Sequence, residues 1–187
     1  MKKIVQLTLL LSLILGYSFQ SQAALLIEPV LGYSFGSANV DVVTSGVSDS
    51  NKETTSGIGY GGRLGYQNLG FQLGLDYLSS KMSVDSNDFN TGEWAGFVGF
   101  EFPILIRVYA GYIFSGSADY ETTSKDSKLS GGTGPKLGIG FTMLPFLDLN
   151  IEYRSVKYEE EKDIAVNTDL NFDYSAIMVG VSLPFTI

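Results

Sequence analysis

Residues 59–67 read GYGGRLGYQ, and along this stretch two kinds of side chain alternate without interruption. Tyr60, Leu64 and Tyr66 share one face of an extended chain, whereas Arg63 and Gln67 share the other face with glycines between them. A period of two indicates a β-strand rather than a helix. The stretch therefore predicts a strand that separates an apolar environment from a polar one.

The same alternation recurs in segments of about ten residues, the length that a tilted strand needs to cross the hydrocarbon core of a membrane. Apolar outward sets include Ile27 and Leu31 in the first segment and Val179 and Val181 in the last. We expect eight strands, at residues 25–35, 59–67, 71–78, 93–102, 105–114, 133–143, 147–154 and 173–185.

The connections between these strands alternate between long and short. Residues 37–56, 79–91, 115–131 and 156–172 form long polar connections, and tight turns are expected at 68–69, 103–104 and 144–146. Membrane barrels place short turns at their periplasmic side and long loops outside. The pattern predicts an all-β fold, an eight-stranded antiparallel up-and-down transmembrane β-barrel. Pro29 and Pro135 fall inside strands, and we expect a bulge or an unpaired carbonyl at each.

A soluble, lipocalin-like barrel is the alternative, and it would turn its apolar residues inward. Aromatic residues favour the membrane barrel because they gather on the apolar face near strand ends, where interfacial girdles lie. These residues are Tyr33, Phe35, Tyr66, Tyr77, Trp94, Phe102, Phe114 and Tyr153.

Residues 1–23 are typical of a cleaved secretory signal peptide, with Lys2 and Lys3 before an apolar stretch and a small-x-small site at 21–23. The apolar stretch is shorter than the roughly 20 residues of a spanning helix. Residues 24–187 are then the barrel domain, and we expect export to the outer membrane of a Gram-negative cell.

Charged residues on the inward faces predict a polar lumen that an eight-stranded barrel has only enough room to fill with side chains. Such charges must pair because isolated buried charges are costly. We expect Glu101 to face Arg107, Lys136 to pair with Glu152, and Glu28 to pair with Arg63 near Asp76. The predicted lumen charge network comprises Glu28, Arg63, Asp76, Glu101, Arg107, Lys136, Glu152 and Arg154, with Glu93 and Asp148 also inward. It either holds the barrel in register or forms a gated ion path.

Composition argues against catalysis and metal binding. The chain has no histidine and no cysteine, so a histidine-based triad and a typical zinc site are both excluded. We predict no enzyme activity, no cofactor and no metal. The 20 acidic against 12 basic residues also make nucleic acid an unsuitable partner. The acidic run at 159–163 is interpreted as a solvated loop, with a weak divalent-mediated contact to lipopolysaccharide as the alternative.

The strand-and-loop layout, the glycine-rich GYGGRLGYQ strand and the paired lumen charges resemble the OmpA-type transmembrane barrel and its small relatives, OmpX and the Ail/Lom group. The resemblance implies insertion by the barrel-assembly machinery. Phe185 and Ile187 alternate as the family's terminal signal requires, although the last residue is not aromatic.

We therefore predict a non-enzymatic, monomeric outer-membrane barrel with a packed polar lumen and acidic outer loops. It would contact outer-membrane lipid and lipopolysaccharide and contribute to envelope integrity or to surface interaction and adhesion. The alternative is a narrow channel or OmpW-like conduit for ions or small hydrophobic compounds. Its support is a set of apolar residues expected to face the lumen: Leu78, Phe97, Tyr109, Ile113 and Met178.

Overall fold

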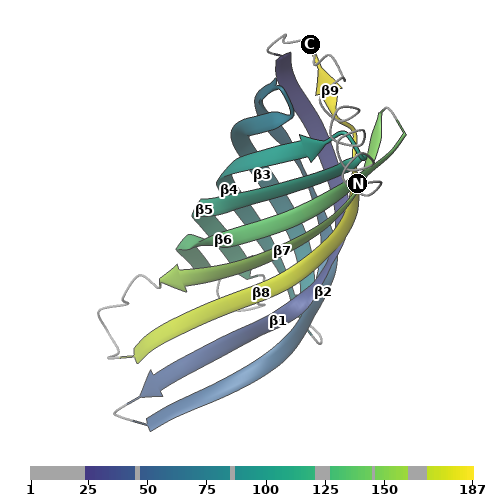
Figure 1. Ribbon diagram of the computed structural model, residues 1–187. Coiled ribbons are helices and arrows are strands. Elements are labelled where there is room, and N and C mark those ends of the chain that lie inside the picture. Colours follow the sequence, from purple (N-terminus) through teal and green to yellow (C-terminus); the bar gives the residue numbers. More distant parts are fainter. Residues whose placement is uncertain (1–23, 45–46, 85–86, 121–126, 145, 160–167) are drawn as a thin grey trace, which may run out of the picture.

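Eight long strands follow one another in chain order, and each pairs antiparallel with the next (Figure 1). The computed structural model describes residues 24–44, 47–84, 87–120, 127–144, 146–159 and 168–187. The strands are β1 (Ala24–Thr44), β2 (Val47–Asn68), β3 (Phe71–Val84), β4 (Asn87–Phe102), β5 (Ile106–Tyr120), β6 (Ser127–Leu144), β7 (Leu147–Glu159) and β8 (Thr168–Ser182). A short β9 (Phe185–Thr186) follows β8 along β1.

Pairing of β1 with both β2 and β8 closes the sheet into a barrel. The predicted all-β, eight-stranded antiparallel barrel is confirmed. In the described part of the chain, no helix is long and apolar enough to cross a membrane. The predicted signal peptide, residues 1–23, lies outside the described residues.

Side chains alternate across the barrel wall as the sequence predicts. Large apolar residues such as Leu31, Leu64 and Val98 are exposed on the outer face, whereas charged residues such as Glu28, Arg63 and Glu152 are buried in the lumen. This is the reverse of a soluble barrel, which buries its apolar residues inside and exposes polar ones. The direction of the alternation therefore matches the membrane barrel rather than the lipocalin-like alternative.

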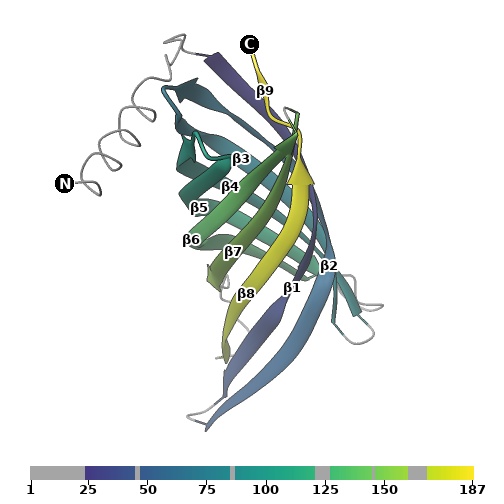
Figure 2. The same ribbon diagram turned by 45° about the vertical axis from the view of Figure 1, so that its right-hand side comes forward.

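The strands are longer than expected, and the long connections are correspondingly shorter. Residues 37–56 were expected to form one loop, but β1 and β2 continue their ladder until Thr44 faces Val47. β8 follows β1 along the same length. These strands reach furthest at the end opposite the C-terminus (Figures 1 and 2). Backbone hydrogen bonds continue to be satisfied by the neighbouring strand there, although the apolar alternation has ended.

The opposite end, hereafter the short-turn end, carries tight turns. Leu69 and Gly70 have φ angles of 50° and 83°, the conformation of a two-residue type I′ hairpin. Leu105, in the turn between β4 and β5, has a φ of 64°.

The expected bulge is found at neither strand proline, because the register is the same on both sides of each. The register of β1 is the same on both sides of Pro29, with Val30 facing Ser182 of β8 and Ile27 facing Phe185 of β9. Pro29 itself lies in the gap between these two ladders, and its carbonyl accepts a hydrogen bond from the Leu183 amide at 3.1 Å. Pro135 faces Tyr112 in register, and β6 pairs with β7 on either side of it without a shift. A proline whose ring faces outward removes one backbone donor without displacing the strand. Register shifts are found at other positions, for example between Trp94 and Ala95.

The lumen is filled in two layers. The layer near the long-loop end is apolar and contains buried residues such as Met82, Phe89, Ile113, Val156 and Tyr174. The layer toward the short-turn end contains the buried charged residues. We call the first the apolar layer and the second the charged layer.

Candidate functional site

The charged layer is assembled by register, because neighbouring strands bring charged residues to the same height. Glu28 on β1 faces Arg63 on β2, and Arg63 faces Asp76 on β3. On the other side of the barrel, Lys136 on β6 faces Arg154 on β7. These residues, with Glu93, Arg107, Asp148 and Glu152, are all buried. Four cations therefore meet five carboxylates inside the barrel.

Arg107 organises the part of the layer nearest the short-turn end. Its guanidinium donates two hydrogen bonds to the Glu28 carboxylate, at 2.8 and 2.6 Å, and a third to Asn150 Oδ1 at 2.9 Å. Asp148 lies 3.3 Å from the same guanidinium. Asn150 in turn donates to Ser182 Oγ at 2.7 Å. A charged pair with this many charge-assisted bonds is held in one geometry.

Glu152 is the centre of the other part of the charged layer, which lies further from the short-turn end than Arg107. Its carboxylate contacts Arg63 at 2.9 Å, Lys136 at 3.2 Å and also Arg154. Lys136 also pairs with Asp76. One carboxylate with three cationic partners joins β2, β6 and β7 across the lumen.

Two contacts extend this network in opposite directions. Arg154 donates to Glu93 at 2.7 Å, next to the apolar layer. Arg63 donates to Glu28 at 3.1 Å and so joins the part around Glu152 to the part around Arg107. The ion pairs therefore form one connected network.

Tyr109 lies among the cations of the network. Its hydroxyl accepts a hydrogen bond from Arg63 at 2.8 Å, and the Arg63 guanidinium lies 4.2 Å from the centre of its ring. A cation over an aromatic face is favourable, more so when both are shielded from water. Gly138 provides the room, since a Cβ built there would lie 2.1 Å from the Tyr109 ring.

Two of the pairs expected from sequence are present and one differs. Lys136 contacts Glu152, and Glu28 contacts Arg63 with Asp76 beside it. Glu101 faces Arg107 in register, but Arg107 is directed to Glu28 and Asp148 instead. Glu101 accepts a hydrogen bond from Gln67 at 3.1 Å and lies nearer the short turns. A half-buried carboxylate close to the barrel mouth competes poorly for a cation that two fully buried carboxylates surround.

Sequence reasoning missed the neutral members of the network. Asn150 lies between two predicted inward acids on β7, so the alternation already placed it in the lumen. Tyr109 was assigned only an apolar role, although its hydroxyl hydrogen bonds to Arg63. A buried tyrosine hydroxyl usually finds a partner, and this rule was the available signal.

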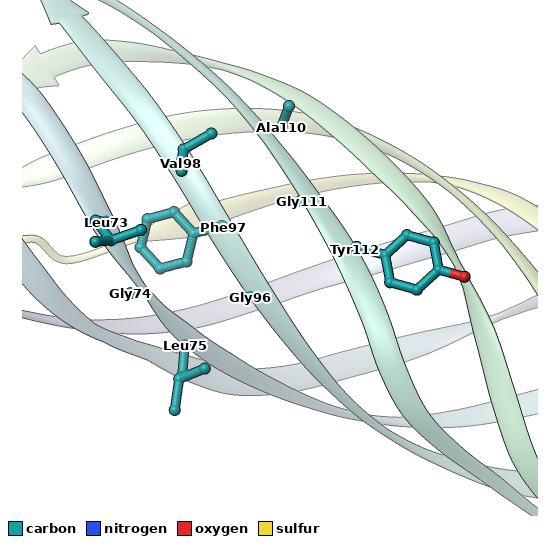
Figure 3. A pocket seen from close by; sticks show the side chains of 9 residues that line it. All are labelled: Leu73, Gly74, Leu75, Gly96, Phe97, Val98, Ala110, Gly111 and Tyr112. Carbon is teal, nitrogen blue, oxygen red and sulfur yellow. The ribbon is translucent and has the colours of Figure 1, made fainter.

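The lumen leaves almost no free space. The cavity among Arg63, Asp76, Lys136, Glu152 and Arg154 has a volume of about 10 Å³, room for about one water molecule. The large hollows lie on the outer face instead. One of about 640 Å³ lies over β3, β4 and β5, where Leu73, Leu75, Val98 and Tyr112 surround Gly96 and Ala110 (Figure 3). The lumen is therefore packed, and the hollows belong to the exterior.

This arrangement pairs each of the four buried cations with at least one carboxylate inside the lumen. The apolar residues named for the conduit alternative are buried and packed against neighbours. Leu78 and Met178 pack with Val30, and Ile113 belongs to the apolar layer. The ion pairs of the site can hold strands of the barrel together across the lumen.

Comparison with known proteins gives the wider context. The family model for the outer membrane protein beta-barrel domain matches residues 7–185. The structure of neisserial surface protein A is similar, with a TM-score of 0.52 and 19% sequence identity over 88% of this chain and 99% of that chain. This likeness shows a shared fold. A search of curated protein sequences finds no match.

Two further solved structures are similar at lower scores. Ail, the attachment invasion locus protein of Yersinia pestis, has a TM-score of 0.48 and 15% identity over 83% of this chain and 98% of that chain. OprG from Pseudomonas aeruginosa has a TM-score of 0.45 and 10% identity over 90% of this chain and 99% of that chain.

Proposed function

Because this chain belongs to the outer membrane protein β-barrel domain family, we propose that it is a non-conducting, non-enzymatic barrel of the Gram-negative outer membrane. Its lumen network acts as an internal brace, and its long-loop end forms an acidic outward surface. The proposed role is a contribution to envelope integrity or to surface interaction.

The observation that carries the proposal is the double blockage of the lumen. The charged layer holds cations and carboxylates in direct contact around a cavity of about 10 Å³. The apolar layer above it contains fully buried Met82 and Ile113. An ion would have to displace both layers, and the apolar layer offers it no compensating charge. This supports a closed barrel over the narrow conduit.

The test is electrical recording from the purified protein in planar bilayers, with the shift in gel mobility between heated and unheated samples as the control for folding. We expect no discrete conductance steps from the wild-type chain. Steps that recur with a defined amplitude in the folded wild type would overturn the proposal and favour the conduit.

Lys136→Leu distinguishes a brace from a gate. Lys136 contacts both Asp76 and Glu152, so it is the cation that could switch between two carboxylates in a gating movement. Its replacement by leucine removes both contacts. In a braced lumen this variant stays silent, because the apolar layer is unchanged. In a gated path it opens or changes conductance.

The absence of histidine from the chain supports a non-enzymatic role, since the usual general base of serine-type hydrolysis is missing. We also propose that the barrel is monomeric, is inserted by the barrel-assembly machinery, and contacts lipid and lipopolysaccharide. Size-exclusion chromatography with light scattering in detergent tests the first point. A mass of two or more chains would contradict it.

Envelope integrity and surface interaction are separated by a variant of the outer acidic run. Glu159, Glu160, Glu161 and Asp163 are replaced by the neutral amides, and cells lacking the protein are complemented with wild type or variant. If the protein maintains envelope integrity, both the wild type and the variant restore the resistance of the cells to detergent. If the role is surface interaction, only the wild type restores adherence, and loss of neither property in the deletion strain would overturn both roles.

A further inference from the structure

The connecting segments at the short-turn end of the barrel carry no charged side chain. Residues 68–71, 102–106, 143–147 and 183–187 make up its turns and the segment after β8, and none of them contains Asp, Glu, Lys or Arg. They read NLGF, FPILI, MLPFL and LPFTI. In a membrane barrel this end faces the periplasm, where polar turns are expected. The opposite end carries the acidic runs, so the asymmetry is not a matter of overall composition.

The apolar side chains of these turns are directed outward. Five of them are between 46% and 68% exposed, and we call them the apolar rim: Leu69, Ile104, Leu105, Leu144 and Phe146. Large apolar side chains exposed together at one end of a protein indicate contact with a membrane or with another protein.

The backbone gives independent support. Among the described residues, the non-glycine residues with positive φ are two leucines, Leu69 and Leu105, and both belong to the rim. Left-handed positions in tight turns favour Gly, Asn or Asp, and leucine is costly there. An apolar environment at the rim explains why leucine stands at both positions despite this backbone strain.

Proline lowers the polarity of the same end further. Two of the five prolines of the chain, Pro103 and Pro184, fall among the described residues of the four rim segments. A proline has no backbone N–H, and each donor removed from a turn is one fewer group that needs water.

The rim is distributed around the barrel rather than on one side. Its turns connect β2 to β3, β4 to β5 and β6 to β7, and Phe71 and Phe102 are the strand residues next to two of these turns. Phe100 contacts Phe71 and Phe102, with ring centres 4.7 and 4.8 Å apart. A partner protein would cover one sector of such a ring, whereas a lipid leaflet surrounds it.

We propose that the apolar rim is immersed in the periplasmic leaflet, so that the turns end among phospholipid acyl chains near the headgroups instead of projecting into the periplasm. The inference rests on the proposed membrane barrel and adds the position of its short-turn end within the bilayer.

Depth-dependent tryptophan quenching tests the immersion. Trp94 is the single tryptophan of the chain, so Trp94→Phe supplies a silent background. Ile104→Trp and Phe146→Trp report the rim on two separate turns. Ile151→Trp, on the outward wall of β7, reports insertion of the barrel, and Glu53→Trp, on the outer part of β2, reports aqueous exposure.

The proteins are reconstituted in phosphatidylcholine vesicles that carry bromine either near the carbonyl or near the methyl end of the acyl chain. We expect both rim tryptophans to be quenched most by bromine near the carbonyl, and much less by aqueous acrylamide than the Glu53→Trp variant. Rim tryptophans as open to acrylamide as Glu53→Trp, with Ile151→Trp quenched by lipid, would overturn the immersion while leaving the membrane barrel intact. Failure of lipid to quench Ile151→Trp would overturn both.

The double variant Leu69→Asn/Leu105→Asn gives a second test, because the urea midpoint for its unfolding should change in opposite directions in a water-exposed and in an immersed rim. Asparagine relieves the left-handed strain, so in a water-exposed rim the urea midpoint for unfolding from vesicles stays equal or rises. In an immersed rim the midpoint falls, because two polar side chains enter the leaflet. An unchanged or raised midpoint contradicts the proposal.

Discussion

Arg107 on β5 and Glu28 on β1 meet across the lumen through two parallel hydrogen bonds, from Nη1 to Oε2 at 2.8 Å and from Nη2 to Oε1 at 2.6 Å. These strands are not neighbours in the sheet and lie half a circuit apart. Both side chains are buried. The pair therefore links opposite walls of the barrel, which the backbone ladder cannot do.

Glu28→Gln should destabilise the barrel because it removes the negative charge that pairs with both Arg63 and Arg107. The substitution keeps the shape of the side chain, so the loss reports the charge alone. Removing one partner of a buried pair costs about 3–5 kcal/mol. We expect a loss of this order in the free energy of unfolding, measured by urea titration in lipid vesicles.

Lys157→Ala is the matched control for Glu28→Gln. Lys157 lies 3.7 Å from Asp173, and both side chains are largely exposed, so this pair contributes at most about 1 kcal/mol. Equal losses for the two variants would show that the internal pair does not brace the barrel.

Lys136 and Asp76 should be strongly coupled in a double-mutant cycle. Lys136→Met leaves Asp76 with only the more distant Arg63, at 3.8 Å, and Asp76→Leu removes one of the two carboxylates that contact Lys136. Each single variant loses stability, and the double variant should lose less than the sum by about 1–3 kcal/mol. The cycle is measured from the same urea titrations, and strict additivity would contradict a direct pair.

The outline of the fold was predictable because a membrane barrel repeats one local rule. The alternation in residues 59–67 sets the direction of every side chain on β2, and its neighbours follow by register. The ends of the strands were not predictable from this rule. Beyond Phe35 the alternation of β1 fades, yet its ladder with β2 continues to Thr44, since backbone pairing does not depend on which side chains are apolar.

The membership of the charged layer was predictable from inward alternation, but its pairing was only partly so. Neighbours in register, such as Glu28 and Arg63, could be derived from strand order. Contacts across the lumen, such as Arg107 with Glu28, depend on the tilt and stagger of the whole barrel. These are global quantities that no single segment encodes.

Gly138→Ala should destabilise the barrel by displacing Tyr109. A Cβ at residue 138 would lie 2.1 Å from the ring, so Tyr109 would have to leave its position beside Arg63. Overpacking of this kind costs about 1–3 kcal/mol, measured as the change in the free energy of unfolding. Tyr109→Leu in the same chain should recover part of the loss, because the smaller side chain no longer meets the added methyl group.

Gly62→Ala is the control for Gly138→Ala. Gly62 also lies within a strand, but the atom nearest to a Cβ built there is the carbonyl oxygen of Glu28, at 3.5 Å. We expect no loss of stability at this position, since alanine also restricts the unfolded chain more than glycine does. A loss equal to that of Gly138→Ala would mean that general backbone effects, rather than the Tyr109 ring, determine the result.

Met82→Ala tests whether the two layers of the lumen block it independently. Met82 is fully buried in the apolar layer, where the Tyr174 hydroxyl lies 3.9 Å from its sulfur. Its truncation leaves a cavity that costs about 2–5 kcal/mol in the free energy of unfolding. Planar bilayers should nevertheless show no conductance steps, because Arg63, Tyr109 and Glu152 still fill the lumen below. Steps in this single variant would place the whole barrier in the apolar layer and leave the charged layer as a polar lining that ions can cross.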